Sequence, residues 1–197
     1  MVTVGFVVEG PSDKKLVESK GFQQWLQETC NLEVVSPVVD AGGNGEMCNT
    51  KIGTYIEKLK MIANPDKTVV LADLDPDICA PCITRRKEII GSDNIDLVVI
   101  ARKAMESWFL ADTEAMRSWT NDSSFYQPLP EATDDMPWDL LREIGLAKTG
   151  RGPGSSKVIF AKKFINKHGF DVMRAANHPD CPSARYFVDR LCALGHE

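Results

Sequence analysis

Four stretches of the chain are continuous apolar runs that are rich in β-branched residues. A run of this kind predicts a strand buried on both faces, which is typical of a parallel sheet. Pro37 lies inside the second run and favours a strand at the edge of the sheet, because proline cannot donate to a central ladder. The predicted strands span residues 2–8, 33–39, 68–72 and 95–101.

The segments between these runs have helical periodicity. The clearest is 52–62, which carries a single apolar stripe, and Asn49 or Thr50 is expected to cap it. Parallel strands need crossover connections, which are usually helices. The alternation therefore predicts an α/β fold with a four-stranded parallel sheet and crossover helices.

Beyond residue 102 the sequence has no further strand pattern. Helices are predicted over 103–119, 138–144, 155–168 and 183–194, with a polar, Pro-containing loop at 120–137. We therefore predict an α/β domain over residues 1–112 and a C-terminal helical extension over residues 113–197 that packs on it. A single domain over the whole chain is the alternative.

The composition narrows the class of protein. A chain of 197 residues with 43% hydrophobic and 26% charged residues is long enough for a full core and is not disordered. No apolar run approaches the ~20 residues that span a bilayer. The first apolar run lacks a basic flank and stops at Glu9, so we do not expect a signal peptide or a membrane partner. The expected location is cytoplasmic.

The net charge of −5 is unevenly distributed. Residues 148–174, the basic arm, hold seven bases against one acid, a net charge of +6, while the rest of the chain is acidic. This arm is either a solvated helix face or a phosphate-binding surface beside an acidic site. Under the second interpretation nucleic acid is the partner, and the contact residues would be Lys148, Arg151, Lys162, Lys163 and Lys167.

Carboxylates recur where the predicted strands end. Ligands of open parallel sheets bind at this carboxyl edge. Several acids at one edge would repel one another unless protons or cations neutralise them, and oxygen ligands suit Mg²⁺ or Mn²⁺. Helix capping is the alternative role for each acid. The residues concerned are Glu9, Asp40, Asp73, Asp75 and Glu106.

Cys79 and Cys82 form the CxxC pair among six cysteines. A zinc site completed by His178 and Cys181 is an open alternative, but buried, reduced cysteines are the favoured interpretation. We therefore expect that Cys79 and Cys82 are not zinc ligands.

Other catalytic motifs are incomplete. The segment 150–157 lacks the second glycine and the preceding strand of a phosphate-binding loop, and no GxSxG elbow is present. Histidine is not expected to drive catalysis.

Two motifs together resemble a known family. Glu9-Gly10 ends the first predicted strand, and Asp73-Leu74-Asp75 ends the third, about 64 residues later. This arrangement resembles the TOPRIM domain of topoisomerases, bacterial primases and OLD-type nucleases. OLD-type members add an acid four residues after the first one, matched here by Asp13, and a glutamate after the next strand, for which Glu106 is the candidate.

The motif resemblance covers roughly residues 2–112. Three further segments, AMESWFLAD, SSK and SARYF, resemble a family of small bacterial TOPRIM-related proteins of unknown function over nearly the full chain. The resemblance implies the fold and a metal site. It also implies a role in bacterial defence, with a protein partner encoded alongside.

The leading hypothesis is a divalent-metal-dependent phosphodiester hydrolase, a nuclease, acting on DNA or RNA. Asp73 and Asp75 would hold one Mg²⁺ or Mn²⁺, and Glu9 would share it or act as general base. Asp13 and Glu106 would help to hold a second ion. Lys157 would neutralise charge that develops on the phosphate.

Two other classes stay open. The first is a catalytically silent subunit that binds nucleic acid or a partner through the same site. The second is a phosphatase of the haloacid-dehalogenase type, in which the first Asp of DxD is a nucleophile. That signature normally lies on the first strand, whereas here it follows the third.

Overall fold

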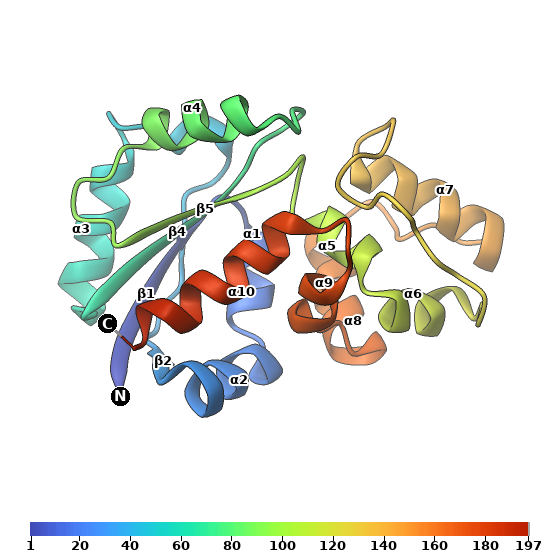
Figure 1. Ribbon diagram of the computed structural model, residues 1–197, viewed down its shortest axis with the longest axis horizontal. Helices are drawn as coiled ribbons and strands as arrows, with labels where there is room; N and C mark the ends of the chain where they lie inside the picture. The colour runs from blue at the N-terminus through green and yellow to red at the C-terminus, as the bar shows by residue number, and fades with distance from the viewer. Residues whose placement is uncertain (197) are drawn as a thin grey trace.

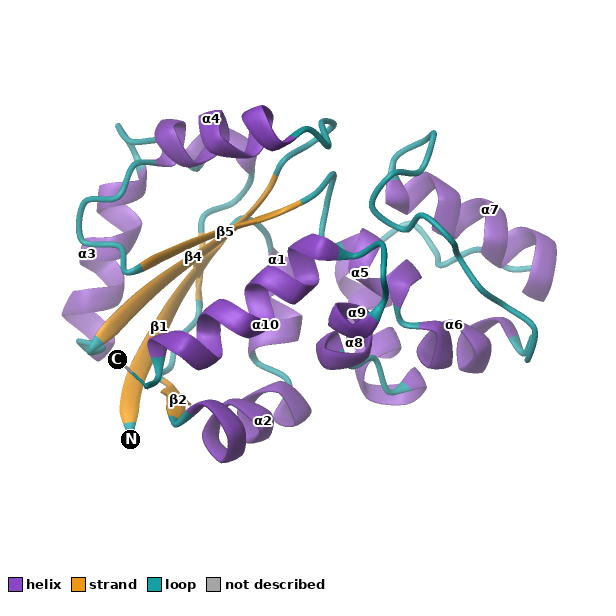
Figure 2. Ribbon diagram, in the orientation of Figure 1, coloured by secondary structure: helices purple, strands orange, loops and turns teal. Residues whose placement is uncertain are grey.

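A computed structural model describes residues 1–196 and has a twisted parallel sheet with helices on both faces (Figure 1, Figure 2). The predicted α/β fold class is confirmed. The strands run in the order β2-β1-β4-β5, and β3 also pairs with β1. Each pairing is parallel. The strands are β1 (Val2–Val8), β2 (Leu32–Val34), β3 (Val39–Asp40), β4 (Lys67–Asp73) and β5 (Leu97–Ala101).

The sheet has five strands rather than the four predicted, because the expected strand at 33–39 is divided in two. β2 pairs with the start of β1, and β3 pairs with its end. Pro37 lies between them and has no N–H to donate, so the ladder is interrupted there. The predicted edge position is confirmed for β2.

Alternation along β1 distributes its side chains to two cores. Val4, Phe6 and Val8 pack on one side with the helices α1, α2 and α10, whereas Val7 packs on the other side with α3 and α4. Both faces of the sheet are therefore covered, as the continuous apolar runs require. The bounds are α1 (Pro11–Val17), α2 (Lys20–Cys30), α3 (Ile52–Ala63), α4 (Ala80–Ile90) and α10 (Pro182–Leu194).

The cap predicted for the helix after residue 50 is wrong. α3 begins at Ile52, after Lys51. Thr50 and Asn49 are not available as caps, because Asn49 donates its N–H to the Ile89 carbonyl and the segment turns there.

The remaining helices lie beyond the carboxyl edge of the sheet (Figure 1). The long helix predicted at 103–119 is two helices, because Asp112 caps the second through a bond from the Ala115 N–H. The main hydrophobic core runs without a break from β1 to α10, so the predicted extension shares the core of the sheet. Its final residue, 197, lies outside the described residues. The bounds are α5 (Glu106–Ala111), α6 (Thr113–Thr120), α7 (Pro137–Thr149), α8 (Lys157–His168) and α9 (Val172–Asn177).

Two disulfides correct the expectation of reduced cysteines. Cys30 at the end of α2 is bonded to Cys192 in α10, and Cys79 is bonded to Cys82. The first pair is 162 residues apart in sequence, so no local pattern could indicate it. Among the helices of residues 1–196, none has the length and apolarity needed to cross a bilayer.

Candidate metal centre

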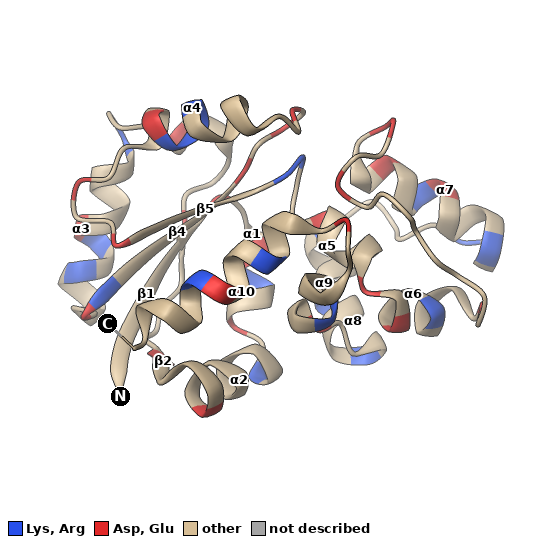
Figure 3. Cartoon of the chain, viewed as in Figure 1, with Lys and Arg blue, Asp and Glu red and all other residues tan. Residues whose placement is uncertain are grey.

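The carboxyl edge of the sheet brings the ends of β1, β4 and β5 side by side. Backbone pairing continues past the strands, since Glu9 donates its N–H to the Leu71 carbonyl at 3.0 Å and Leu74 donates to Ala101 at 2.9 Å. Figure 3 shows acidic positions at the end of β4 and in the loop after it, with basic positions just after β5. The residues that follow the strands are therefore held close together.

Glu9 is buried at the end of β1 and is held by two donors. Its Oε2 accepts the Asp73 N–H at 3.0 Å and a hydrogen bond from Arg86 Nη2 at 3.3 Å. Burial raises the pKa of Glu9, and these two donors offset only part of that effect. Glu9 is thus a carboxylate with increased basicity at the junction of β1 and β4.

Asp73 ends β4 and faces the start of α5. Its Oδ1 accepts the Met105 N–H at 3.0 Å, and its backbone carbonyl accepts from Arg86 Nε at 3.3 Å. Burial, together with the negative charges of Asp13, Glu106 and Glu9, holds the pKa of Asp73 well above its usual value. The four carboxylates therefore form one electrostatic cluster.

Asp13 and Glu106 complete this carboxylate cluster from two helices. Asp13 lies in the first turn of α1, where Oδ2 accepts the Gly10 N–H at 2.9 Å. Burial and the nearby Glu106 raise the pKa of Asp13 to about 8. Glu106 is the first residue of α5 and is only 3% exposed.

Lys157 reaches this cluster from α8, far along the sequence. Its Nζ lies 3.1 Å from Glu106 Oε1, and its side chain remains 44% exposed. Burial alone would lower the pKa of Lys157, but the attraction of Glu106, Asp73 and Asp13 outweighs it and raises the pKa. A cation that is partly open to solvent therefore stands beside the carboxylates.

Three candidate residues lie outside the carboxylate cluster. Asp75 is exposed on the loop after β4, although its charge still raises the pKa of Glu9. The Asp40 carboxylate accepts the Gly42 N–H at 2.8 Å and so stabilises a turn. Lys148 pairs with Asp122 at 2.8 Å, which lowers the pKa of Asp122, whereas Arg151, Lys162, Lys163 and Lys167 are exposed.

Two buried cations at this edge were missed in the sequence. Arg86, on α4, joins Glu9 to the carbonyls of Asp73 and Met47. Lys103 follows β5, and its Nζ donates to the carbonyls of Thr133 and Asp135 in the loop before α7. A base directly after a strand could have indicated Lys103, but Arg86 resembles an ordinary helix-surface charge.

The donor chemistry of the carboxylate cluster fits a divalent cation of the Mg²⁺ or Mn²⁺ kind. All four groups offer oxygen, and the two contacting cations, Arg86 and Lys157, leave an excess of negative charge. In residues 1–196, however, no three His, Cys, Asp or Glu side chains are arranged as ligands of one ion. Binding therefore requires side-chain rotation, for instance of Glu106 away from Lys157.

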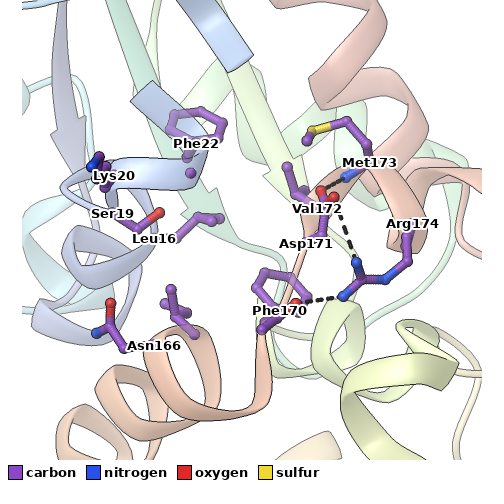
Figure 4. A pocket seen from close by; sticks show the side chains of 13 residues that line it. Leu16, Ser19, Lys20, Phe22, Asn166, Phe170, Asp171, Val172, Met173 and Arg174 are labelled. Carbon is purple, nitrogen blue, oxygen red and sulfur yellow. Dashed lines mark hydrogen bonds and ion pairs between the residues drawn. The ribbon is translucent and has the colours of Figure 1, made fainter. Parts of the chain in front are cut away.

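A separate cavity of about 330 Å³ lies between the α1–α2 turn and the α8–α9 segment (Figure 4). Leu16, Phe22 and Phe170 contribute apolar lining. Its Arg174 is already bonded to Asp112 Oδ2 at 2.8 Å and to the Gly169 carbonyl. None of the four clustered carboxylates lines this cavity.

Fold and site together define an α/β protein with a carboxylate cluster at the carboxyl edge of a parallel sheet. No family model and no curated protein sequence matches the chain. Among solved structures, it is similar to the C-terminal region of the Burkholderia pseudomallei OLD protein. That similarity has a TM-score of 0.45 and 15% sequence identity, and covers 97% of this chain and 99% of the other.

Proposed function

We propose that this protein is a TOPRIM-like, divalent-metal-dependent phosphodiester hydrolase that acts on nucleic acid. The observation that carries the proposal is the convergence of Glu9, Asp13, Asp73 and Glu106 beside Lys157, where electrostatic repulsion holds the pKa of Asp13 and Asp73 high. Such uncompensated carboxylates are the surroundings in which a divalent cation is favoured.

Mg²⁺ or Mn²⁺ would be held by oxygens of Asp73, Glu9, Asp13 and Glu106, with the exposed Asp75 joining when the nucleic acid binds. When bound, the ions would polarise the scissile phosphate and stabilise its leaving oxygen.

The chain's own groups have separate tasks. Glu9 is the candidate general base, because burial increases the basicity of its carboxylate. Lys157 would neutralise charge on the phosphate, since its side chain is both close to the carboxylate cluster and partly exposed. Arg86 is a positioning residue: it is buried behind Glu9 and holds that carboxylate in place.

The test is cleavage of plasmid DNA, single-stranded DNA and RNA with Mg²⁺, with Mn²⁺ and with chelator. We expect cleavage only with metal, and a loss of roughly 100-fold or more in Asp73→Asn. Asp93→Asn is the matched control, because Asp93 is exposed in the loop before β5 and should cleave like the wild type. Cleavage in chelator, or by Asp73→Asn at the wild-type rate, would refute the proposal.

Calorimetry with Mn²⁺ tests the metal separately from turnover. Asp73→Asn and Glu106→Gln should each bind the ion more weakly than the wild type, whereas Asp93→Asn should not. Equal binding by all of these proteins would remove the metal centre.

A silent binding subunit is the second candidate. It is favoured by the fact that Glu9 and Glu106 already pair with Arg86 and Lys157. Under this alternative the protein binds nucleic acid, but no metal supports cleavage in the same assay.

A further inference from the structure

Cys79 and Cys82 lie at the start of α4, on the loop that follows the candidate metal centre. Cys79 is the N-cap residue, and its Sγ accepts the Cys82 N–H at 3.1 Å. The two sulfurs are bonded to each other, and Pro81 stands between them in the first helical turn. The pair is thus preorganised by the backbone of one helix.

We propose that Cys79 and Cys82 form a thiol–disulfide exchange site, which dithiol reductants open and dithiol oxidants close while the protein stays folded. This inference does not depend on the proposed hydrolase activity, because it concerns only the two sulfurs and the helix that holds them.

Accessibility distinguishes this disulfide from the second one in the chain. Cys79 is exposed and Cys82 is half-buried, so a thiolate can approach the Cys79 sulfur from solvent. Cys30 is fully buried in the main core and Cys192 packs against that core. Attack on a disulfide requires access to a sulfur, so exchange in the folded state is expected only at Cys79–Cys82.

The helix favours the sulfur that attack on the disulfide releases. The N-terminus of α4 carries partial positive charge, its first turn has no acidic side chain, and the Cys82 N–H points at Cys79 Sγ. These features stabilise a thiolate at Cys79.

The exchange balances with one dithiol molecule. A thiolate of the reductant attacks Cys79 Sγ, the Cys79–Cys82 bond breaks, and Cys82 leaves as a thiolate that takes a proton from solvent. The second reductant thiol then attacks the mixed disulfide at the reductant's own sulfur and releases Cys79. Two electrons pass to the cysteines, and the reductant becomes a disulfide.

α4 remains anchored when the disulfide opens. Arg86, one turn after Cys82, bonds Glu9 and the carbonyls of Asp73 and Met47, and Ile90 is buried in the second core. Reduction therefore should not unfold the helix.

The first experiment treats the full-length protein with dithiothreitol, quenches aliquots with an alkylating reagent, and maps each cysteine by peptide mass spectrometry. We expect Cys79 and Cys82 to become labelled at least ~10-fold faster than Cys30 and Cys192, and to re-form their bond in oxidised dithiothreitol. Circular dichroism at each time point should stay native. Equal rates, labelling only after unfolding, or failure to re-form the bond would each overturn the proposal.

The second experiment identifies the attacked sulfur in a Cys48→Ser background, which removes the half-buried free thiol. The probe is 5,5′-dithiobis(2-nitrobenzoate). Cys82→Ser, which keeps Cys79, should react at least ~10-fold faster than Cys79→Ser, which keeps Cys82. The reverse order, or equal rates, would contradict attack at Cys79.

Discussion

Asp13 shows at the scale of one residue how the carboxylate cluster stores unfavourable charge. Burial and the charge of Glu106 raise its pKa to about 8, from a usual value of 3.8. Between these two values the folded protein keeps a proton that the unfolded chain releases. The unfolding free energy of the metal-free protein therefore falls as pH rises from about 4 to about 8, and the loss is complete above the folded-state pKa.

Asp13→Asn should flatten this pH dependence in chelator. The amide removes the charge, while its oxygen can still accept the Gly10 N–H, so α1 should remain intact. In the wild type the Asp13 contribution falls by up to about 1.4 kcal/mol per pH unit within the window. Urea unfolding at pH 5, 6, 7 and 8 measures the slope. Asp93→Asn should retain the wild-type slope, and an unchanged slope in Asp13→Asn would contradict the explanation.

At the scale of an element, α8 joins the carboxylate cluster to an exposed basic surface. Lys157 begins the helix beside Glu106, and Lys162, Lys163 and Lys167 continue along it in solvent. A phosphate backbone could therefore lie along α8 with one phosphate at the site.

Replacing Lys162, Lys163 and Lys167 with alanine should weaken nucleic-acid binding and leave turnover at saturation nearly unchanged. Each lost phosphate contact releases fewer counterions, so the slope of log K against log salt should flatten by roughly two to three units. Removing three charges elsewhere, from Lys51, Lys58 and Lys60 at α3, should leave the slope intact. An unaltered slope in the α8 variant would mean that the arm is a solvated helix face. Lys157→Ala should instead lower turnover, because that lysine lies at the site.

A second element, the loop before α7, depends on Lys103. This buried ammonium group donates to the carbonyls of Thr133 and Asp135. Lys103→Met keeps much of the volume but leaves those carbonyls without a charged donor, which should cost about 2–3 kcal/mol of unfolding free energy. Hydrogen exchange of residues 131–136 should accelerate, whereas the exposed control Lys58→Met should match the wild type. Unchanged exchange in Lys103→Met would show that the loop is held by other contacts.

At the scale of the whole molecule, Cys30–Cys192 joins α2 to α10 across 162 residues. Opening so large a loop increases the entropy of the unfolded chain, so Cys30→Ser with Cys192→Ser should lower the unfolding free energy by about 3–5 kcal/mol. Urea unfolding at fixed pH measures this loss. Cys48→Ser should change it little, because Cys48 is not disulfide-bonded. A double variant as stable as the wild type would show that packing of α10 alone closes the fold.

Local pattern was sufficient for much of the architecture. The runs that end at Glu9, Asp73 and Ala101 form β1, β4 and β5, because unbroken apolar sequence can only be satisfied by burial on both faces. The order of strands and helices then implies parallel pairing, which places the strand-end acids at one edge. The carboxylates Glu9 and Asp73 could therefore be nominated from sequence alone.

Side-chain partners were decided only by the tertiary structure. Glu9 pairs with Arg86, 77 residues away, and Glu106 pairs with Lys157 from a helix beyond the sheet. Neither pair has a local signal, because partner choice depends on where distant segments meet. The same is true of Cys30–Cys192. Sequence periodicity records which face of an element is buried, but only the packed chain determines which charges and sulfurs meet there.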